Sequence, residues 1–117
     1  MPIDVQALRD DLLSRKLKSV LILGSPEVMR TKQVKGPLAL AHIAVLAPSD
    51  EEKAWLEAVI EMGAENADTE HFRRLVDHAA EHGSQLAVIL DPTLMKLASR
   101  SQLKTPVLDG QMYVVNG

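Results

Sequence analysis

The sequence contains no cysteine, which excludes disulfide bonds, catalysis by a thiol and metal sites built on cysteine. Aromatic side chains are almost as scarce, because Trp, Tyr and Phe each occur once in 117 residues. The core must therefore be aliphatic. Proteins that stack bases generally expose several aromatic rings. Together with a net charge of −3, this composition disfavours binding to nucleic acid.

Long apolar runs are also missing, and no stretch approaches the roughly 18 residues that a membrane-spanning helix needs. The first residues, Met1–Asp4, show neither the basic nor the apolar part of a secretory leader. We therefore expect a cytoplasmic protein with no membrane contact. A chain of this length suits one core, so residues 1–117 are predicted to form a single α/β domain.

The charges are unevenly distributed along the chain. Residues 14–36 contain six basic residues and one acidic residue, whereas residues 49–82 contain ten acidic residues and three basic ones. Such a division favours association with an oppositely charged protein, or head-to-tail association of two copies.

Three short apolar runs, at residues 19–24, 42–47 and 85–90, have the composition of strands buried on both faces. Helices are predicted at about 4–16, 50–62, 68–82 and 92–100, from apolar spacing and from capping residues at their ends. The predicted caps are Asp4, a capping box of Ser49 and Glu52, and Asp68 or Thr69. Residues 25–41 contain two prolines and a glycine, so we expect a loop with one helical turn. Alternating strands and helices favour a mostly parallel sheet between two helical layers.

The C-terminal segment resembles a β-hairpin. Residues 106–108 and 111–115 are apolar, and the intervening Asp109-Gly110 is a typical two-residue hairpin turn. The predicted fold class is thus an α/β three-layer sandwich, with a mostly parallel central sheet and a C-terminal antiparallel β-hairpin.

The order of elements over residues 42–115 resembles that of thioredoxin-like proteins. The Thr105-Pro106 dipeptide adds to the resemblance, since a threonine often precedes a cis-proline at that strand in the family. The family's CxxC motif would fall at Pro48–Glu51, where this chain has no cysteine. The resemblance therefore implies a thioredoxin-like fold without redox activity, of the kind used in binding or assembly.

A basic segment follows the first predicted strand and offers a candidate ligand site. Ser25, Arg30, Lys32 and Lys35 lie beyond the carboxyl end of that strand, where parallel sheets commonly bind anions. Neither a dinucleotide-binding motif nor a P-loop motif is present. The alternatives are a protein-contact loop and a solvated basic loop.

Asp91 ends the third apolar run, a position where α/β enzymes often carry an acid. Pro92 gives it a structural explanation as well, because an acidic cap followed by proline is typical of a helix start. Both interpretations stay open at this point.

The string His78-Ala79-Ala80-Glu81-His82 matches the H-x-x-E-H pattern of some zinc peptidases. His82 directly precedes Gly83 at the predicted helix end, which is a poor place for a metal ligand. We therefore interpret the string as a solvated helix face, and we predict no metal and no cofactor.

These observations lead to a function prediction that depends mainly on exclusions. We expect a non-catalytic protein-interaction or regulatory module of a cytoplasmic assembly, with Thr105, Pro106, Met112 and Tyr113 on its partner-binding edge. The alternative is a small hydrolase or transferase that binds a phosphorylated ligand at the 24–36 basic loop, with Asp91 as its acid.

Overall fold

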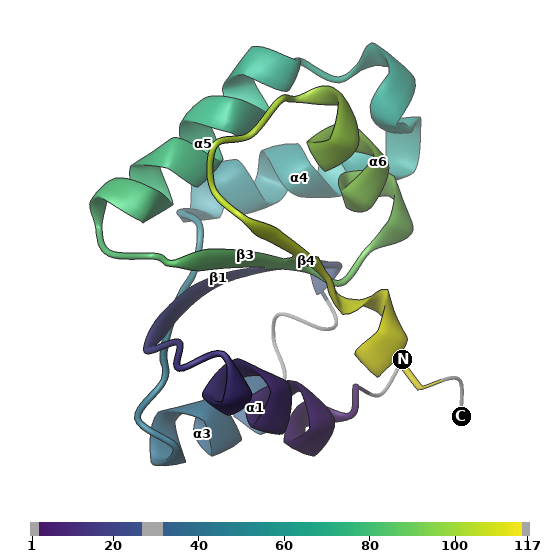
Figure 1. Ribbon diagram of the computed structural model, residues 1–117. Helices are drawn as coiled ribbons and strands as arrows, with labels where there is room; N and C mark the ends of the chain where they lie inside the picture. Colours follow the sequence, from purple (N-terminus) through teal and green to yellow (C-terminus); the bar gives the residue numbers. More distant parts are fainter. Residues whose placement is uncertain (1–2, 27–31, 116–117) are drawn as a thin grey trace.

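The computed structural model describes residues 3–26 and 32–115, which are built around a four-stranded parallel sheet. Its strands are β1 (Ser19–Leu23), β2 (Ala44–Leu46), β3 (Leu86–Ile89) and β4 (Val107–Asp109), in the order β2-β1-β3-β4 (Figure 1). Ser19 of β1 lies opposite Ala44 of β2, and Val20 lies opposite Leu86 of β3. The parallel pairing predicted for the three apolar runs is confirmed.

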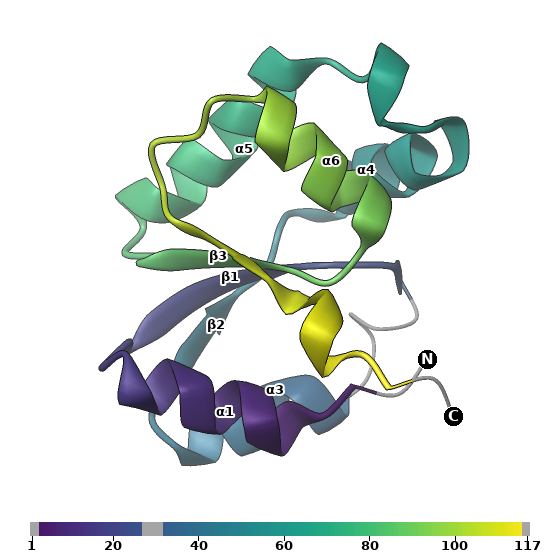
Figure 2. The same ribbon diagram turned by 45° about the vertical axis from the view of Figure 1, so that its right-hand side comes forward.

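Helices cover both faces of the sheet. The helices α1 (Val5–Ser14) and α3 (Lys32–Leu40) pack on one face, and α4 (Asp50–Met62), α5 (Thr69–Glu81) and α6 (Pro92–Arg100) pack on the other (Figure 2). A short 3-10 helix, η1 (Ala64–Asn66), connects α4 to α5. The chain winds from β1 to β2 in one direction and from β2 to β3 and β4 in the other. The direction reverses between β1 and β3, which makes this the topological switch point of the sheet.

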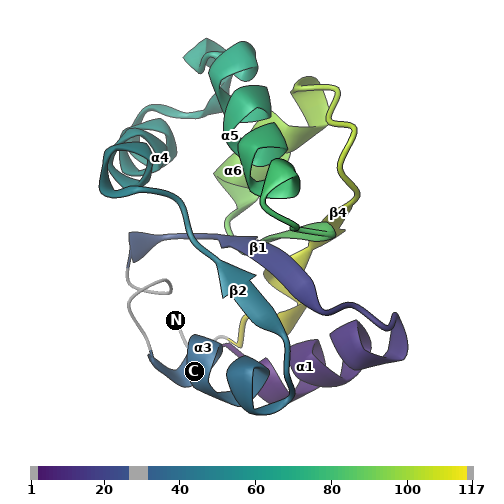
Figure 3. The same cartoon turned by 90° about the vertical axis from the view of Figure 1, so that its left-hand side faces the viewer.

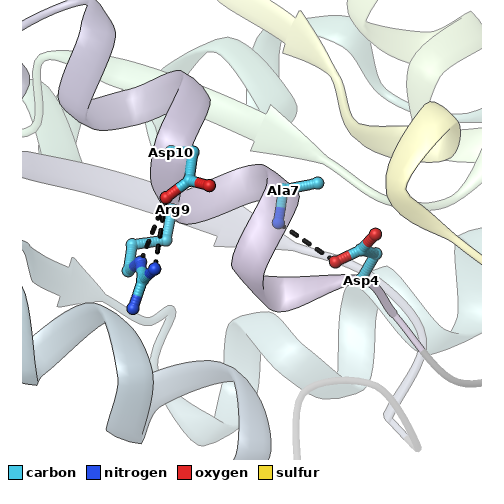
Figure 4. A network of polar contacts seen from close by, with 4 residues as sticks. All are labelled: Asp4, Ala7, Arg9 and Asp10. Carbon is cyan, nitrogen blue, oxygen red and sulfur yellow. Dashed lines mark hydrogen bonds and ion pairs between the residues drawn. The ribbon is translucent and has the colours of Figure 1, made fainter.

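The predicted capping residues begin the helices. The Asp4 carboxylate accepts a hydrogen bond of 3.0 Å from the Ala7 N–H at the start of α1 (Figure 4), where an Arg9–Asp10 ion pair lies on the next turn. Ser49 and Glu52 form the predicted capping box of α4. Caps of this kind stabilise a helix by about 1 kcal/mol each, so the local sequence fixes where these helices start.

The sheet divides the core into two apolar clusters, because successive side chains of a strand point to opposite faces. Leu21 and Leu23 of β1 face α4, α5 and α6, with Phe72 at the centre of that cluster. Val20 and Ile22 face α1 and α3. Fully burying one such side chain stabilises the fold by about 1.5–3 kcal/mol.

The predicted C-terminal hairpin is wrong. β4 runs parallel to β3, with Ala87 opposite Val107, and Gly110–Tyr113 form a 3-10 helix, η2, in place of a return strand. The Asp109 carboxylate accepts from the Gln111 N–H and so caps this helix. Gly110 is required by packing, since an added Cβ would overlap Leu90 Cδ2 and lie 3.0 Å from the Ile89 carbonyl oxygen. No antiparallel strand pairs within the described sheet, so the antiparallel part of the predicted fold class is also wrong.

Two further predictions about local structure are wrong. Residues 32–40 form α3 instead of a loop, although the helix contains Pro37, because Val34 and Leu38 are buried against the sheet. β2 is an edge strand, not one buried on both faces, and its Ala44 is exposed. Tertiary position therefore outweighs local propensity at both places.

The two ends of the described chain meet beside α1. Ile3 and Val114 form an isolated antiparallel bridge, and the Asp4 N–H donates to the Tyr113 carbonyl at 2.6 Å. The Tyr113 hydroxyl also donates to the Asp11 carboxylate. Within residues 3–26 and 32–115, no helix is long and apolar enough to cross a membrane.

Candidate ligand-binding site

The carboxyl ends of the strands form the edge of the sheet at which open α/β folds bind ligands. β1 ends at Leu23 and is followed by Gly24, β2 leads through Pro48 into α4, and β3 ends at Ile89, two residues before Asp91. In Figure 3, β2 rises directly into α4, and the end of β1 lies below that helix. The first turns of α4 therefore stand over the end of β1, which is one of the two strands that flank the switch point.

A cavity of about 310 Å³ lies between the end of β1 and α4. Leu23, Gly24 and Pro26 form the β1 wall, and the buried Pro48 closes the cavity at the entry to α4. On α4 itself, Ala54 and Leu56 contribute further apolar surface. The volume is at the lower end of the range for small-molecule sites, so the cavity suits a small ligand.

Three charged side chains of α4 form the polar wall of this cavity: Asp50, Lys53 and Glu57. They lie three and four residues apart, so they share one face of the helix. All three are exposed, and in the part of the chain that the structure describes none of them forms an ion pair within 4.0 Å. The cavity thus offers one ammonium group and two carboxylates to a ligand.

The structure places Asp91 at the start of α6. Its Oδ1 accepts hydrogen bonds from the Thr93 N–H at 2.8 Å and from the Leu94 N–H at 3.2 Å. This arrangement is the helix cap that the sequence offered as one explanation. Asp91 does not line the cavity described above.

The predicted anion-binding residues are not brought together with Asp91. Ser25 lies between two residues that line the cavity, but Lys35 is exposed on α3, on the opposite face of the sheet from α6. Arg30 lies outside the described residues, as does the side chain of Lys32. The part of Ser25 and the basic residues in ligand binding therefore stays a prediction.

The four predicted partner-binding residues lie at two separate places. Thr105 and Pro106 line a shallow hollow with Asp77 and Gln85, at the amino end of the strands. Met112 and Tyr113 belong to η2, at the carboxyl end, where Met112 is 69% exposed. A continuous hairpin edge does not exist, and association through the charged faces remains a prediction.

Tyr113 is buried, contrary to its assignment to an exposed edge. Its burial, followed by the hydrogen bond to Asp11, raises the pKa of the phenol to about 12. The same hydrogen bond, together with one from Arg15 at 3.0 Å, lowers the pKa of the Asp11 carboxyl. This cluster connects α1 to η2 and has a structural role.

The two histidines of the H-x-x-E-H string lie in contact at the end of α5. The ring centroids of His78 and His82 are 4.5 Å apart in an edge-to-face arrangement. Both rings line a second cavity, of about 330 Å³, together with Ser49 and Glu52. Among the described residues, no three histidine, aspartate or glutamate side chains are grouped so that they could hold a metal ion.

No protein-family model matches the chain, and no curated protein matches its sequence. Several solved structures match its fold. A candidate Asp/Glu racemase from Yersinia pestis superposes with a TM-score of 0.78 at 18% identity, and an aspartate racemase homologue from Pyrococcus horikoshii OT3 with 0.75 at 21%. The fold is racemase-like. Each match covers 91% of this chain and 49% of the other, so this chain spans about half the length of those proteins.

These matches overturn the thioredoxin-like assignment. The sheet is parallel throughout in the order β2-β1-β3-β4, and it matches domains of proteins described as racemases. The implied cis-proline is absent as well, because none of the described peptide bonds is cis. The Thr105-Pro106 dipeptide and the element order misled because many α/β folds share them.

The function predicted from the sequence is wrong for the same reason. The interaction or regulatory module depends mainly on exclusions, and its alternative, a small hydrolase or transferase, depends on the basic loop and Asp91. The fold is instead one found in proteins described as amino-acid racemases.

Sequence reasoning missed the charged wall of the cavity. In the sequence, Lys53 stands out only as one of three basic residues in the acidic segment 49–82. One signal was available: Lys53 is the only basic residue in α4, and it lies in the first turn of the helix that follows β2.

Proposed function

We propose that this chain is a ligand-binding domain of the racemase type, which binds a small carboxylic acid at the carboxyl edge of its sheet. The observation that carries the proposal is the cavity beside the end of β1, with the ammonium group of Lys53 on its wall and no ion-pair partner for it among the described residues. The carboxylate of the ligand pairs with Lys53, and the remainder of the ligand lies against Pro26 and Ala54.

The position of the cavity supports this proposal. Ligands of doubly wound sheets bind beyond the carboxyl ends of the strands, next to the switch point, and this cavity begins at Leu23, the last residue of β1. The fold likeness supports it too, because the matched proteins are described as racemases of amino acids, which are carboxylic acids.

The absence of cysteine limits the chemistry that the domain can perform. A racemase has to remove the α-proton on one face of its substrate and deliver a proton on the other. This chain has no thiol to do either. The proposal therefore concerns recognition of the carboxylate and assigns no proton transfer to this chain.

The proposal is tested by titrating the protein with isovalerate and with isovaleramide, its uncharged counterpart, while following amide NMR shifts. Isovalerate should shift the amides of residues 23–26 and 50–57, whereas isovaleramide should not. In a Lys53→Met variant, which keeps most of the apolar stem, isovalerate should bind up to roughly fivefold more weakly.

The control is Lys96→Met, since Lys96 is exposed on α6 and does not line the cavity. It should bind isovalerate like the parent protein. Equal binding of the acid and the amide, or equal losses in the two variants, would refute the proposal. The cytoplasmic location expected from the sequence remains a prediction beside it.

A further inference from the structure

We infer that the cavity selects a zwitterionic amino acid with a small apolar side chain, and that it discriminates against dicarboxylic acids such as aspartate and glutamate. This inference rests on the proposed function and adds the class of ligand to it. It follows from the sequence of charges along α4 and from the chemistry of the opposite wall.

The charges of α4 alternate in sign along the cavity. Lys53 lies between Asp50, three residues before it, and Glu57, four residues after it. One helical turn advances about 5.4 Å, so a carboxylate stands about one turn from the ammonium group in each direction. The charged groups of an α-amino acid are closer together than that, so a ligand carboxylate on Lys53 leaves its ammonium group within reach of Asp50 or Glu57.

These side chains are available to a ligand. Neither Asp50 nor Glu57 forms an ion pair within 4.0 Å in the described part of the protein, although both are within helical reach of Lys53. A zwitterion therefore does not have to break an existing ion pair before it binds.

The wall opposite α4 is apolar. Leu23 is fully buried, Gly24 and Pro48 are buried, and Pro26 is half-buried. None of these residues carries a charged group or a side-chain hydrogen-bond donor. A ligand side chain that points at this wall loses water and meets no polar side chain of these four residues, which favours an aliphatic group and disfavours a carboxylate.

A second carboxylate on the ligand would also lack a cation. Lys53 is the only basic residue among the described residues that line the cavity, and two carboxylates flank it. L-Aspartate carries a net charge of −1 and would meet three described charges that sum to −1, whereas a monocarboxylic zwitterion carries no net charge. The cavity therefore favours a ligand such as L-valine over L-aspartate.

The experiment compares L-valine, isovalerate and L-aspartate in the same NMR titration. Isovalerate is valine without its ammonium group, so the ratio of the two affinities isolates the part played by Asp50 and Glu57. L-Valine should bind up to roughly fivefold more tightly than isovalerate, as expected for one additional charged contact at an exposed site. It should also bind more tightly than L-aspartate, whose second carboxylate meets no cation among the described lining residues.

The variant Glu57→Gln should reduce the preference for L-valine over isovalerate and should improve the relative binding of L-aspartate. Glu61→Gln is the matched control, because Glu61 is exposed one turn further along α4 and does not line the cavity. It should leave both ratios unchanged. Asp50→Asn measures the same two affinity ratios for the other carboxylate on the α4 wall of the cavity.

The outcomes separate the two proposals. If isovalerate binds as tightly as L-valine while isovaleramide does not bind, the carboxylate site stands and the selectivity inferred here is wrong. If L-aspartate binds more tightly than L-valine, the inference is also wrong. If none of the acids binds, both the proposed function and this inference fail.

Discussion

Gly110 provides the sharpest test of the packing at the end of β4. In a Gly110→Ala variant the new methyl group would overlap Leu90 Cδ2 and lie 3.0 Å from both the Ile89 carbonyl oxygen and Val88 Cγ1. Favourable contacts between carbon atoms lie at about 3.5–4.0 Å. The Leu90 side chain could rotate away, but the carbonyl belongs to β3 and cannot move without disturbing the sheet. Overpacking of this kind costs about 1–3 kcal/mol.

The same substitution at Gly36 is the matched control, because it tests alanine at a glycine without the close packing of Gly110. Chain neighbours aside, a Cβ at Gly36 would meet nothing within 4 Å, and the residue lies inside α3 without a positive φ. Alanine there gains about 0.5–1 kcal/mol of backbone entropy relative to glycine. A Cβ directly before Pro37 disfavours the helical backbone, so the two effects offset each other and the net change should be small.

Thermal unfolding followed by circular dichroism would measure both effects. For a domain of this size 1 kcal/mol corresponds to roughly 4 °C in Tm, so Gly110→Ala should lower Tm by roughly 4–12 °C, whereas Gly36→Ala should change it by less than roughly 4 °C in either direction. Urea unfolding should show changed midpoints with the same m-value. A Gly110→Ala protein that melts at or above the parent temperature would refute the close packing of η2 on β3.

Two other predictions follow from the hydrogen bonds of Asp91 and Tyr113. Asp91→Ala should destabilise the protein by about 1 kcal/mol in urea unfolding, whereas Asp91→Asn should retain most of the stability, because asparagine caps a helix as well as aspartate does; equal losses would mean that Asp91 acts through its charge. For Tyr113 the folded-state pKa is raised from 10.0 to about 12, so its contribution to stability is complete below pH 10 and is lost as the pH rises towards 12. The difference in unfolding free energy between the parent and Tyr113→Phe should therefore shrink over that range, and a constant difference would contradict the assignment.

The sequence predicted the elements whose signals are local. The caps Asp4, Ser49 and Asp68 were recognisable from residues within one turn of each helix start, and each makes the expected hydrogen bond to a backbone N–H. The buried runs of β1 and β3 were equally clear, because strands at the centre of a parallel sheet are apolar on both faces.

The predictions of local structure failed where a short sequence pattern reflects contacts with residues far away in the chain. Asp109-Gly110 has the composition of a hairpin turn, but its glycine is set by the approach of η2 to Leu90 and Ile89 on another strand. The helix α3 forms despite Pro37 because the side chains of Val34 and Leu38 are buried in the core. The cavity was not predicted for the same reason, since it is lined by Lys53, Leu23 and Pro26, which come together only after the sheet has formed.

The hydrogen bond between Tyr113 and Asp11 also allows one step of folding to be followed by the absorbance of the protein itself. The two residues are 102 positions apart, and closing a loop of that length costs about 4 kcal/mol in chain entropy, more than the roughly 1.5–3 kcal/mol from a hydrogen bond to a charged group. The bond can therefore form only after the sheet has brought the chain ends together. Because the chain has a single tyrosine, the tyrosinate absorbance during refolding at alkaline pH would time the closure of these ends, without any added label.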